Sequence, residues 1–442
     1  MTIRMDEGAA ELLDTLHRAG YAAYVVGGCV RDSLLGLTPH DWDLCTSALP
    51  QQGMELFGEE KCIPTGLQHG TVTVKQGGRL YEITTFRTEG TYTDGRHPDE
   101  VHFVPNVRED LARRDFTINA MAYNEKEGLV DPFGGQADLQ SGILRAVGVP
   151  HRRFTEDALR ILRLYRFAAR FGFSIDLPTA QAAQELCAHL DCVSVERIEE
   201  ELAKLLSAPA PAAYLDEKIL GVVLPELSPE ALAAAKPVVD ACPAGEQALP
   251  VRLAALLLSL GEDGTRRTLR RLRCSNACIE ETAVLVREAV PGVPGAFSSD
   301  TNRAIPSPAL LPAATGSHPS GRSSEKLPAR PPVSLNIYTR KLLGQYGLKT
   351  VQRLAALGTA LQPEHAADFA ALSELAERLD ADGVCCRVSQ LAVNGRDLMA
   401  AGVPAGPGIR KVLEALLDGV IREEYPNERQ ALLAAVQQLA AS

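Results

Sequence analysis

The stretch YVVGGCVRDSLLGLTPHDWDL, residues 24–44, contains an apolar run, a glycine pair, a helical pattern and two aspartates in close succession. The run Tyr24–Val26 predicts a strand that stops at Gly27 and Gly28, and residues 29–35 continue at helical spacing. Two glycines at a strand-to-helix turn let backbone N–H groups and a helix N-terminus approach a phosphate closely. The pattern therefore predicts a phosphate-binding turn, with an ordinary glycine turn as the alternative.

Asp41 and Asp43 follow this helix, and Asp43 opens another extended run. Residues at i and i+2 of a strand point to one face, so both carboxylates can ligate the same hard cations. A phosphate cradle beside a metal-binding pair is what metal-assisted phosphoryl or nucleotidyl transfer requires. The alternative for this pair alone is a solvated strand edge.

The composition is that of a globular protein with several domains. The chain has 442 residues, 45% of them apolar, which is enough for about two to four packed domains. Its net charge of −11 argues against a surface that coats polyanions indiscriminately. Basic runs at residues 266–273 and 321–355 nevertheless leave a nucleic-acid partner open.

The cysteines and the N-terminal residues bear on the compartment. Ten cysteines are scattered without Cys-x-x-Cys spacing, so zinc and a disulfide framework are both poorly supported. The first residues carry acids and no apolar core, and no apolar stretch approaches membrane-spanning length. We therefore expect a cytoplasmic protein with reduced thiols and no membrane partner.

The pattern along the chain changes once, near residue 150. Residues 1–148 mix short β-branched runs with helices and glycine turns, which predicts one α/β domain. From Phe154 onward the pattern is almost wholly helical. Residues 292–332 are dense in Pro, Ser and Gly and predict a linker or insertion, before a last helical block at 333–442.

Five strings occur in a specific order: TGLQHGTVTV (65–74), YEITTFR (81–87), LARRDFTINAMAYN (111–124), DPFGGQADL (131–139) and TEDALRILRLYRFAARFGF (155–173). In this order and at these spacings they resemble the class II tRNA nucleotidyltransferases, the bacterial CCA-adding enzymes. The resemblance implies an α+β protein with a polymerase-β-like nucleotidyltransferase head. It also implies untemplated addition of C, C and A to tRNA 3′ ends from CTP and ATP, with release of pyrophosphate.

The resemblance also implies all-α neck, body and tail domains after the head. We place these domains as follows: head at 1–148, neck at 149–206, body at 207–291 and tail at 333–442. The tail of the family grips the tRNA elbow. Gly406-Pro407-Gly408, before a helix with Arg410 and Lys411, is therefore a candidate site for an RNA phosphate, with an ordinary helix start as the alternative.

The resemblance assigns the carboxylates a catalytic role. Asp41 and Asp43 hold two Mg²⁺ ions, of which one lowers the pKa of the tRNA 3′-hydroxyl and the other braces the triphosphate. Glu82 is our candidate third carboxylate, because strand alternation in YEITTFR sets it opposite Tyr81 and Ile83. An exposed strand glutamate is the alternative for Glu82.

Three head residues match nucleotide-binding positions of the family. Gly28 is expected to offer its backbone N–H to a phosphate, and Arg31 and Arg114 are expected to contact the nucleotide. The alternative for Arg31 is an ion pair with Asp32 or another neighbour. We expect Asp115 to orient Arg113 or Arg114, Asn119 to meet the ribose, and an amphipathic helix to follow residues 113–116.

The neck string carries charges at three- and four-residue spacing, which predicts one shared helix face. These residues are Asp157, Arg160, Arg163, Arg166 and Arg170. In the family, the pair matching Asp157 and Arg160 imitates a complementary base. The carboxylate accepts from the exocyclic amine of cytosine or adenine, and the guanidinium donates to the ring nitrogen, whereas guanine and uracil present the reverse pattern. Arg163 and Arg166 match positions that support the base or triphosphate. A salt-bridged solvent face is the alternative.

Related activities remain as competitors. Bacterial poly(A) polymerases typically carry an arginine-rich string where this chain has TGLQHGTVTV, and CC-adding enzymes have a shortened loop after the TTFR strand. Residues 88–98 form a full-length loop here, which favours complete CCA addition and leaves an A-only enzyme open. A non-catalytic RNA-binding protein would be expected to lack the aspartates. The sequence leaves tRNA preference and the possibility of a homodimer open.

Overall fold

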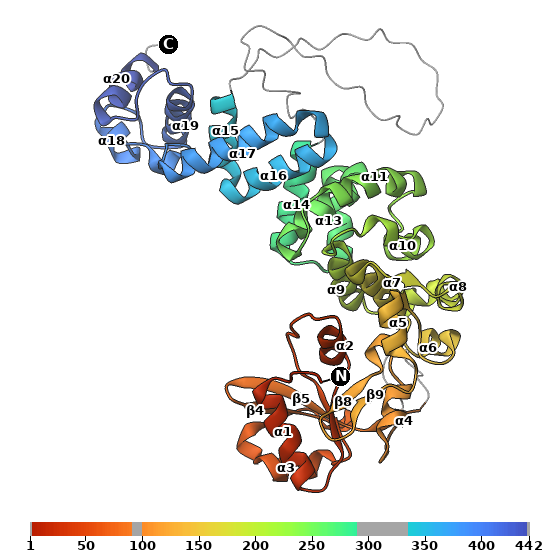
Figure 1. Ribbon diagram of the computed structural model, residues 1–442. Helices are drawn as coiled ribbons and strands as arrows, with labels where there is room; N and C mark the ends of the chain where they lie inside the picture. The colour runs from red at the N-terminus through yellow and green to blue at the C-terminus, as the bar shows by residue number, and fades with distance from the viewer. Residues whose placement is uncertain (1, 91–99, 290–334, 440–442) are drawn as a thin grey trace. The chain divides into compact units, whose positions relative to one another are not determined.

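The computed structural model describes residues 2–90, 100–289 and 335–439 (Figure 1). The chain divides into two compact units. The first unit contains Met1–Lys236 with residues 244–246 and 268–274, and the second contains the remainder. The predicted 292–332 linker and most of the predicted 88–98 loop lie outside the described residues.

A seven-stranded sheet forms the centre of the first unit. Its order is β3 (Cys62–Gly66), β4 (Thr71–Gln76), β5 (Arg79–Thr85), β2 (Leu44–Thr46), β1 (Ala23–Val26), β8 (Ala122–Asn124) and β9 (Gly128–Val130). Strands β2 and β5 pair in parallel, and the other neighbours pair antiparallel. Two smaller two-stranded sheets complete the strands: β6 (Arg87–Glu89) with β7 (Val101–Phe103), and β10 (Ile143–Leu144) with β11 (Ser174–Ile175).

Helices α1 (Glu7–Arg18) and α3 (Pro50–Phe57) pack on this sheet and against each other (Figure 1). The Asp6 side chain caps α1, and the helix buries one apolar stripe, as an amphipathic surface helix should. All four residues of β1 are buried because the strand lies within the sheet. The expected strand before the glycine pair and the expected helix after it, α2 (Gly28–Leu34), are both present.

The prediction of an amphipathic helix after residues 113–116 is wrong. Helix α4 (Val107–Ala112) ends before this segment, and only a short 3₁₀ turn at Thr117–Asn119 precedes strand β8. The Asp115 side chain accepts the Phe116 backbone N–H at 2.8 Å, a local bond that competes with helix formation. Strand β8 then pairs with both β1 and β9, so tertiary pairing overrides the helical spacing.

Helices follow the sheet domain in the first unit. They are α5 (Gly135–Ser141), α6 (Pro150–Glu156), α7 (Leu159–Phe171), α8 (Leu177–Leu186), α9 (Val195–Leu206), α10 (Glu217–Val223) and α11 (Pro229–Ala241), the last of which runs into the second unit. Helix α7 packs on α9, and α6 packs on α8. The predicted inner face of α7 is buried at Leu159, Leu162, Tyr165 and Ala169.

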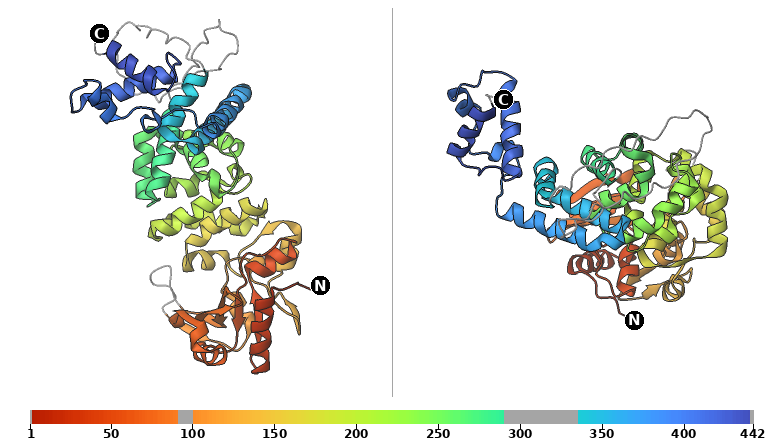
Figure 2. Two further views of the ribbon diagram at one scale, coloured as in Figure 1. Left: turned by 90° about the vertical axis from the view of Figure 1, so that its left-hand side faces the viewer. Right: turned by 90° about the horizontal axis from the view of Figure 1, so that it is seen from above.

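The second unit is helical throughout its described part. It contains α12 (Leu249–Leu257), most of α13 (Gly261–Arg271), α14 (Asn276–Ala289), α15 (Leu335–Tyr346), α16 (Leu348–Leu361) and α17 (Ala366–Ala381). The last helices, dark blue in Figure 2, are α18 (Gly395–Ala400), α19 (Gly408–Ile421) and α20 (Arg429–Leu439), which share a core at Leu398, Leu416 and Leu432. In the described part of the chain, no helix is long and apolar enough to cross a bilayer. The predicted α+β class, a sheet domain followed by helices, is confirmed.

Candidate active site

The carboxylate pair lies at the edge where β2 begins. Asp41 and Asp43 are not within a strand, as the spacing predicts, but come directly before β2. Exposure still alternates, because both aspartates are exposed and Trp42 between them is buried. Leu44 pairs in parallel with Ile83, which brings the preceding residues Asp43 and Glu82 to neighbouring positions. Strand pairing therefore brings Glu82 beside Asp43, and Asp41 lies two residues before Asp43.

The pKa of Asp43 is raised by its surroundings. Its carboxylate is reached by water yet closely surrounded by protein, and this loss of solvation raises its pKa to about 6. Repulsion from Glu82 and, more weakly, from Asp41 raises the pKa further, and Arg114 opposes the shift. A site that concentrates negative charge in this way favours a bound cation. The Asp43 carbonyl accepts the Val26 N–H at 2.9 Å, which fixes the cluster beside the end of β1.

The glycine turn brings Arg114 to the same place. Gly27 has φ of 77°, a left-handed conformation that favours glycine, and a Cβ placed there would lie 3.0 Å from Arg114 Nη1. Arg114 donates to the buried Asp110 carboxylate at 3.3 Å, while its buried Nε has no hydrogen-bond partner among the described residues. A buried donor without a partner is costly, so Arg114 is suited to receive an anionic ligand at the turn.

Arg31 is held inside the protein. Its Nε donates to Asp32 at 2.8 Å and its Nη1 donates to the Asn119 side-chain oxygen at 2.5 Å. The guanidinium also lies over the rings of Phe167 and Phe171, at 5.2 and 4.9 Å from their centroids. The Asp32 ion pair that the sequence offered as the alternative is thus present, and Arg31 is 4% exposed.

The carboxylate that pairs with both Arg113 and Arg114 is Asp110, whereas Asp115, the carboxylate expected to orient one of them, binds α7. One oxygen accepts from Arg163 Nε at 3.0 Å and Nη2 at 2.7 Å, and the other accepts from Asn119 at 3.0 Å. Burial alone would raise the pKa of Asp115, but Arg163 and Asn119 outweigh it and hold the pKa well below its usual range. Asn119 is therefore engaged between Asp115 and Arg31, although the sequence predicts a ribose contact.

Glu201 on α9 is an acid that the sequence did not indicate. It is 4% exposed and pairs with Arg166 Nε at 2.7 Å and with Arg163 Nη1 at 3.7 Å. Arg166 also stacks 3.9 Å from the centroid of Phe167. Desolvation outweighs Glu201 and lowers the pKa of Arg166 to about 10. The arginines of α7 thus find their acids on other segments, and only spatial proximity could have revealed them.

Asp157 departs from the predicted helix face. It lies between α6 and α7 with an extended backbone (φ −147°), and its Oδ1 accepts the Leu159 N–H at 3.1 Å. Arg197 on α9 donates to both of its oxygens, at 3.3 and 2.8 Å. Asp157 also helps to raise the pKa of Arg163, although less than Asp115 and Glu201 do. Arg197 is a second residue that the sequence did not single out.

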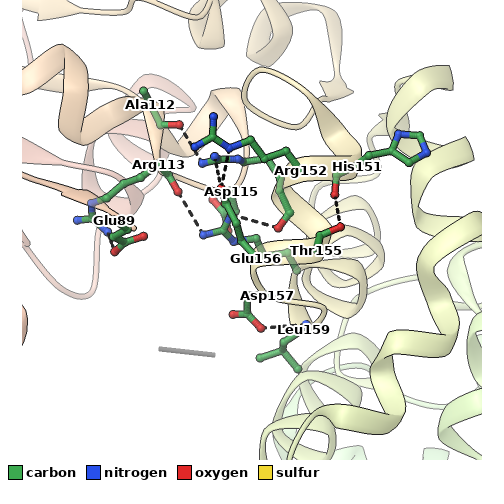
Figure 3. Close-up of polar contacts among 12 residues, drawn as sticks. Glu89, Ala112, Arg113, Asp115, His151, Arg152, Thr155, Glu156, Asp157 and Leu159 are labelled. Carbon is green, nitrogen blue, oxygen red and sulfur yellow. Dashed lines mark hydrogen bonds and ion pairs between the residues drawn. The ribbon is translucent and has the colours of Figure 1, made fainter. Parts of the chain in front are cut away.

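Arg160 lies in the first turn of α7 and reaches Arg113 in the sheet domain. Its Nη1 donates to the Glu156 carboxylate at 2.9 Å and to the Arg153 carbonyl at 3.2 Å, and its Nη2 donates to the Arg113 carbonyl at 3.2 Å. Figure 3 shows the Arg113 carbonyl and the Glu156 side chain close to each other, and Asp157 beside Leu159. Asp157 therefore precedes α7 and Arg160 lies in its first turn, and their side chains bind different partners.

The predicted tail site has a confirmed helix start and an exposed arginine. Helix α19 begins at Gly408, directly after Gly406-Pro407, and the Arg410 side chain is 85% exposed. Arg410 donates to Glu414 one turn along at 2.8 Å. Its role in binding RNA stays a prediction.

The carboxylate cluster fits a hard divalent cation by its donor chemistry. Asp41 and Asp43 offer only oxygen ligands, and their charges are crowded enough to perturb the pKa of Asp43. Across the described ranges, no three His, Cys, Asp or Glu side chains stand in position to hold a metal together. The two aspartates would thus need water or substrate oxygens to complete the coordination, while Glu82 lies beside them.

Three family models match the chain. The model described as "Poly A polymerase head domain" matches residues 23–145, and "Probable RNA and SrmB- binding site of polymerase A" matches 172–230. The model described as "tRNA nucleotidyltransferase domain 2 putative" matches residues 337–436. The matches cover the sheet domain, the segment between α7 and the start of α11, and the helices from α15 to α20.

Curated relatives match over nearly the whole length. A CCA-adding enzyme of Geobacillus thermodenitrificans is 35% identical over 435 residues, which cover 96% of this chain and 95% of that protein. Another, of Limosilactobacillus fermentum, is 36% identical over 442 residues, covering 98% and 97%. The solved structure of the Bacillus stearothermophilus CCA-adding enzyme in complex with CTP matches with a TM-score of 0.78 and 30% identity, covering 99% of this chain and 98% of that one. The chain belongs to the family of CCA-adding enzymes, the tRNA nucleotidyltransferases.

Proposed function

We propose that this protein adds cytidine, cytidine and adenosine in turn to the 3′ end of tRNA, from CTP and ATP, with release of pyrophosphate. The observation that carries the proposal is the match to CCA-adding enzymes along 96% of the chain. The crowding of Asp43, Glu82 and Arg114 at the glycine turn supports it, because nucleotidyl transfer needs carboxylates for a cation and donors for a triphosphate.

We propose Mg²⁺ as the cation, held by Asp41 and Asp43 with Glu82 beside them. When bound there, Mg²⁺ would lower the pKa of the attacking 3′-hydroxyl and stabilise the charge that develops on the leaving pyrophosphate. The Gly28 N–H, at the N-terminus of α2, is suited to receive a phosphate oxygen. Arg114 would neutralise the triphosphate with its Nε, which no described residue engages in a hydrogen bond. Arg31 would act from behind the turn, where its Nη2 lies 3.7 Å from a Cβ built on Gly28.

We infer that Asp157 and Arg160 select the base. A carboxylate has about four lone-pair sites, and Leu159 and Arg197 use three on Asp157, which leaves one for the exocyclic amine of cytosine or adenine. Arg160 has five N–H groups, and its described partners Glu156, Arg153 and Arg113 take three. Two N–H groups are then left for a ring nitrogen.

Guanine and uracil would set an acceptor against Asp157 and a donor against Arg160. Each such buried mismatch costs about 1–3 kcal/mol, so two mismatches suffice to reject these bases. Arg163 and Arg166, crowded with Arg31 and Phe167 beside this pair, are suited to support the base or the triphosphate. The arrangement gives the protein a template made of side chains.

The remaining assignments concern the rest of the chain. We propose that residues 1–148 are the head, 149–206 the neck, 207–291 the body and 333–442 the tail. The tail would hold the tRNA elbow at the start of α19, where Arg410 is exposed. We place the enzyme in the cytoplasm, where its tRNA and nucleotide substrates occur.

The proposal is tested with a tRNA that lacks its last three nucleotides. The enzyme is incubated with CTP alone, with ATP alone and with both, and product lengths are read on a sequencing gel. Two added residues with CTP alone and three with both support CCA addition. Arrest after two residues with both nucleotides would indicate a CC-adding enzyme, and a long ladder with ATP alone would indicate a poly(A) polymerase.

A further inference from the structure

Four side chains form a continuous hydrogen-bonded line between the sheet domain and α7, within the first unit. Arg31 Nη1 donates to the Asn119 oxygen at 2.5 Å, and the Asn119 amide nitrogen donates to Asp115 Oδ1 at 3.0 Å. Asp115 Oδ2 in turn accepts two hydrogen bonds from Arg163, at 3.0 and 2.7 Å. The line thus connects the residue behind the glycine turn with a residue in the middle of α7.

The middle of this line is closed to water. Arg31, Asn119 and Asp115 are 4%, 7% and 9% exposed, whereas the Arg163 side chain is 34% exposed. Phe167 lies against both ends, with its centroid 5.2 Å from the Arg31 guanidinium and 5.4 Å from that of Arg163. Buried, charge-assisted hydrogen bonds of this kind have one well-defined geometry, so the two arginines are fixed relative to each other.

We propose that Asp115 is a positioning residue for nucleotide binding, which with Asn119 fixes the spacing between Arg31 and Arg163. The proposal rests on the function proposed above. Arg31 would act at the phosphate end of the nucleotide and Arg163 at the base end. One buried carboxylate would thus fix the positions of both guanidinium groups relative to each other. Asp115 itself reaches the nucleotide only through these partners.

The line also explains why the Asn119 amide has one orientation. Its nitrogen faces a carboxylate that only accepts, and its oxygen faces a guanidinium that only donates. Removing the Asp115 charge would leave Arg163 with Glu201, 3.7 Å from its Nη1, as its remaining ion-pair partner in the described part of the chain. Arg163 would then shift along α7 toward Glu201 and away from the nucleotide.

The first experiment is steady-state kinetics of D115N with truncated tRNA. The variant is isosteric, but its amide offers an acceptor to only one side, so either Arg163 or Asn119 loses its bond. We expect KM for CTP and for ATP to rise about tenfold each, with kcat changed at most about threefold. E226Q is the matched control, because Glu226 holds Arg271 through two bonds of 2.7 and 2.8 Å outside the proposed site.

The pattern of the kinetic change separates positioning from stability. A purely structural defect reduces the amount of active enzyme, which lowers kcat and leaves KM unchanged. KM values of D115N within about twofold of wild type would overturn the proposal. If D115N does not fold, N119A tests the same line, since it removes the link to Arg31 and keeps the Asp115–Arg163 pair. Unchanged KM in that variant would equally overturn it.

A double-mutant cycle tests whether Asp115 acts through Arg163. If it does, the double variant D115N/R163M should have the same KM as R163M alone. If the two residues act independently, the fold-changes in KM of the single variants should multiply in the double variant. Multiplying effects would overturn the proposal. The outcome is distinct from failure of the proposed function, because wild-type enzyme that adds no C or A would refute that function before any variant is compared.

Discussion

Arg197 on α9 holds both carboxylate oxygens of Asp157, with Nη1 at 3.3 Å from Oδ1 and Nη2 at 2.8 Å from Oδ2. The Leu159 N–H fixes the same carboxylate from the start of α7 at 3.1 Å. Three donors from two helices thus orient a residue that belongs to neither helix. The orientation of Asp157 is set by its contacts with α7 and α9 and not by its own segment alone.

Asp157→Ala should impair use of CTP and ATP together and relax discrimination against UTP and GTP. The reason is that the mismatched acceptor of uracil or guanine no longer faces a carboxylate, a contact that costs about 1–3 kcal/mol. Arg197→Met should relax discrimination less, because the carboxylate remains but loses its orientation. Single-nucleotide incorporation with each of the four NTPs measures both variants. Wild-type selectivity in Asp157→Ala would reduce Asp157 to a helix-capping acid.

Asp41→Asn and Asp43→Asn should abolish incorporation of C and of A while tRNA binding stays near wild type. Trp42, the only tryptophan, lies between the two aspartates and offers a readout without turnover. Paramagnetic Mn²⁺, titrated with CTP in the absence of tRNA, should quench Trp42 fluorescence in the wild type and much less in either variant. D14N, on an exposed acid of α1, serves as the control. Equal quenching in all four proteins would contradict the metal assignment.

Gly27→Ala should lower the stability of the fold through backbone strain, whereas Gly28→Ala should weaken nucleotide binding by hindering the approach of a phosphate. At Gly27 the φ of 77° and the Arg114 Nη1 atom 3.0 Å from the new Cβ make alanine costly, by about 1–2 kcal/mol for the backbone alone. At Gly28 the nearest atom is 3.7 Å away, so G28A should keep wild-type stability but raise KM for both nucleotides. Urea unfolding followed by Trp42 fluorescence gives the stability. A G28A enzyme with wild-type KM would remove Gly28 from the phosphate site.

Asp115 should make the stability of the first unit pH-dependent at acid pH. Its folded-state pKa lies below the unfolded value of about 3.9, so the charge stabilises the fold fully above that pH and progressively less below it. The free energy of unfolding of wild type minus that of D115N should be constant above about pH 5 and shrink below about pH 4. Urea titrations followed by Trp42 fluorescence measure it. A difference that stays constant down to about pH 3 would contradict the ion pair.

The sequence predicts features that depend on neighbouring residues in the chain. The strand β1, the turn at Gly27 and the helix α2 follow one another within a dozen residues, and local spacing suffices to place them. Alternation in β5 likewise predicts that Tyr81 and Ile83 are buried and Glu82 exposed, as they are. The resemblance of five ordered strings extends these local predictions to the family.

Partners that come from distant segments could not be read from spacing. Asp115 binds Arg163, 48 residues away, and Asp157 binds Arg197, 40 residues away. Asp157 was placed on a helix because its spacing to Arg160 is helical, although the chain turns between α6 and α7 at that residue. The prediction of a helix after residues 113–116 is wrong for the same reason, since β8 forms only by pairing with β1 and β9.

We propose that side chains, not a nucleic-acid strand, choose the added bases. The most direct measurement supplies all four NTPs at equal concentration to a tRNA without its last three nucleotides and sequences the 3′ ends of the products. We expect CCA to be the dominant extension and addition to stop after the third nucleotide. Extensions that contain U or G at substantial frequency, or runs of A beyond the third position, would contradict this proposal.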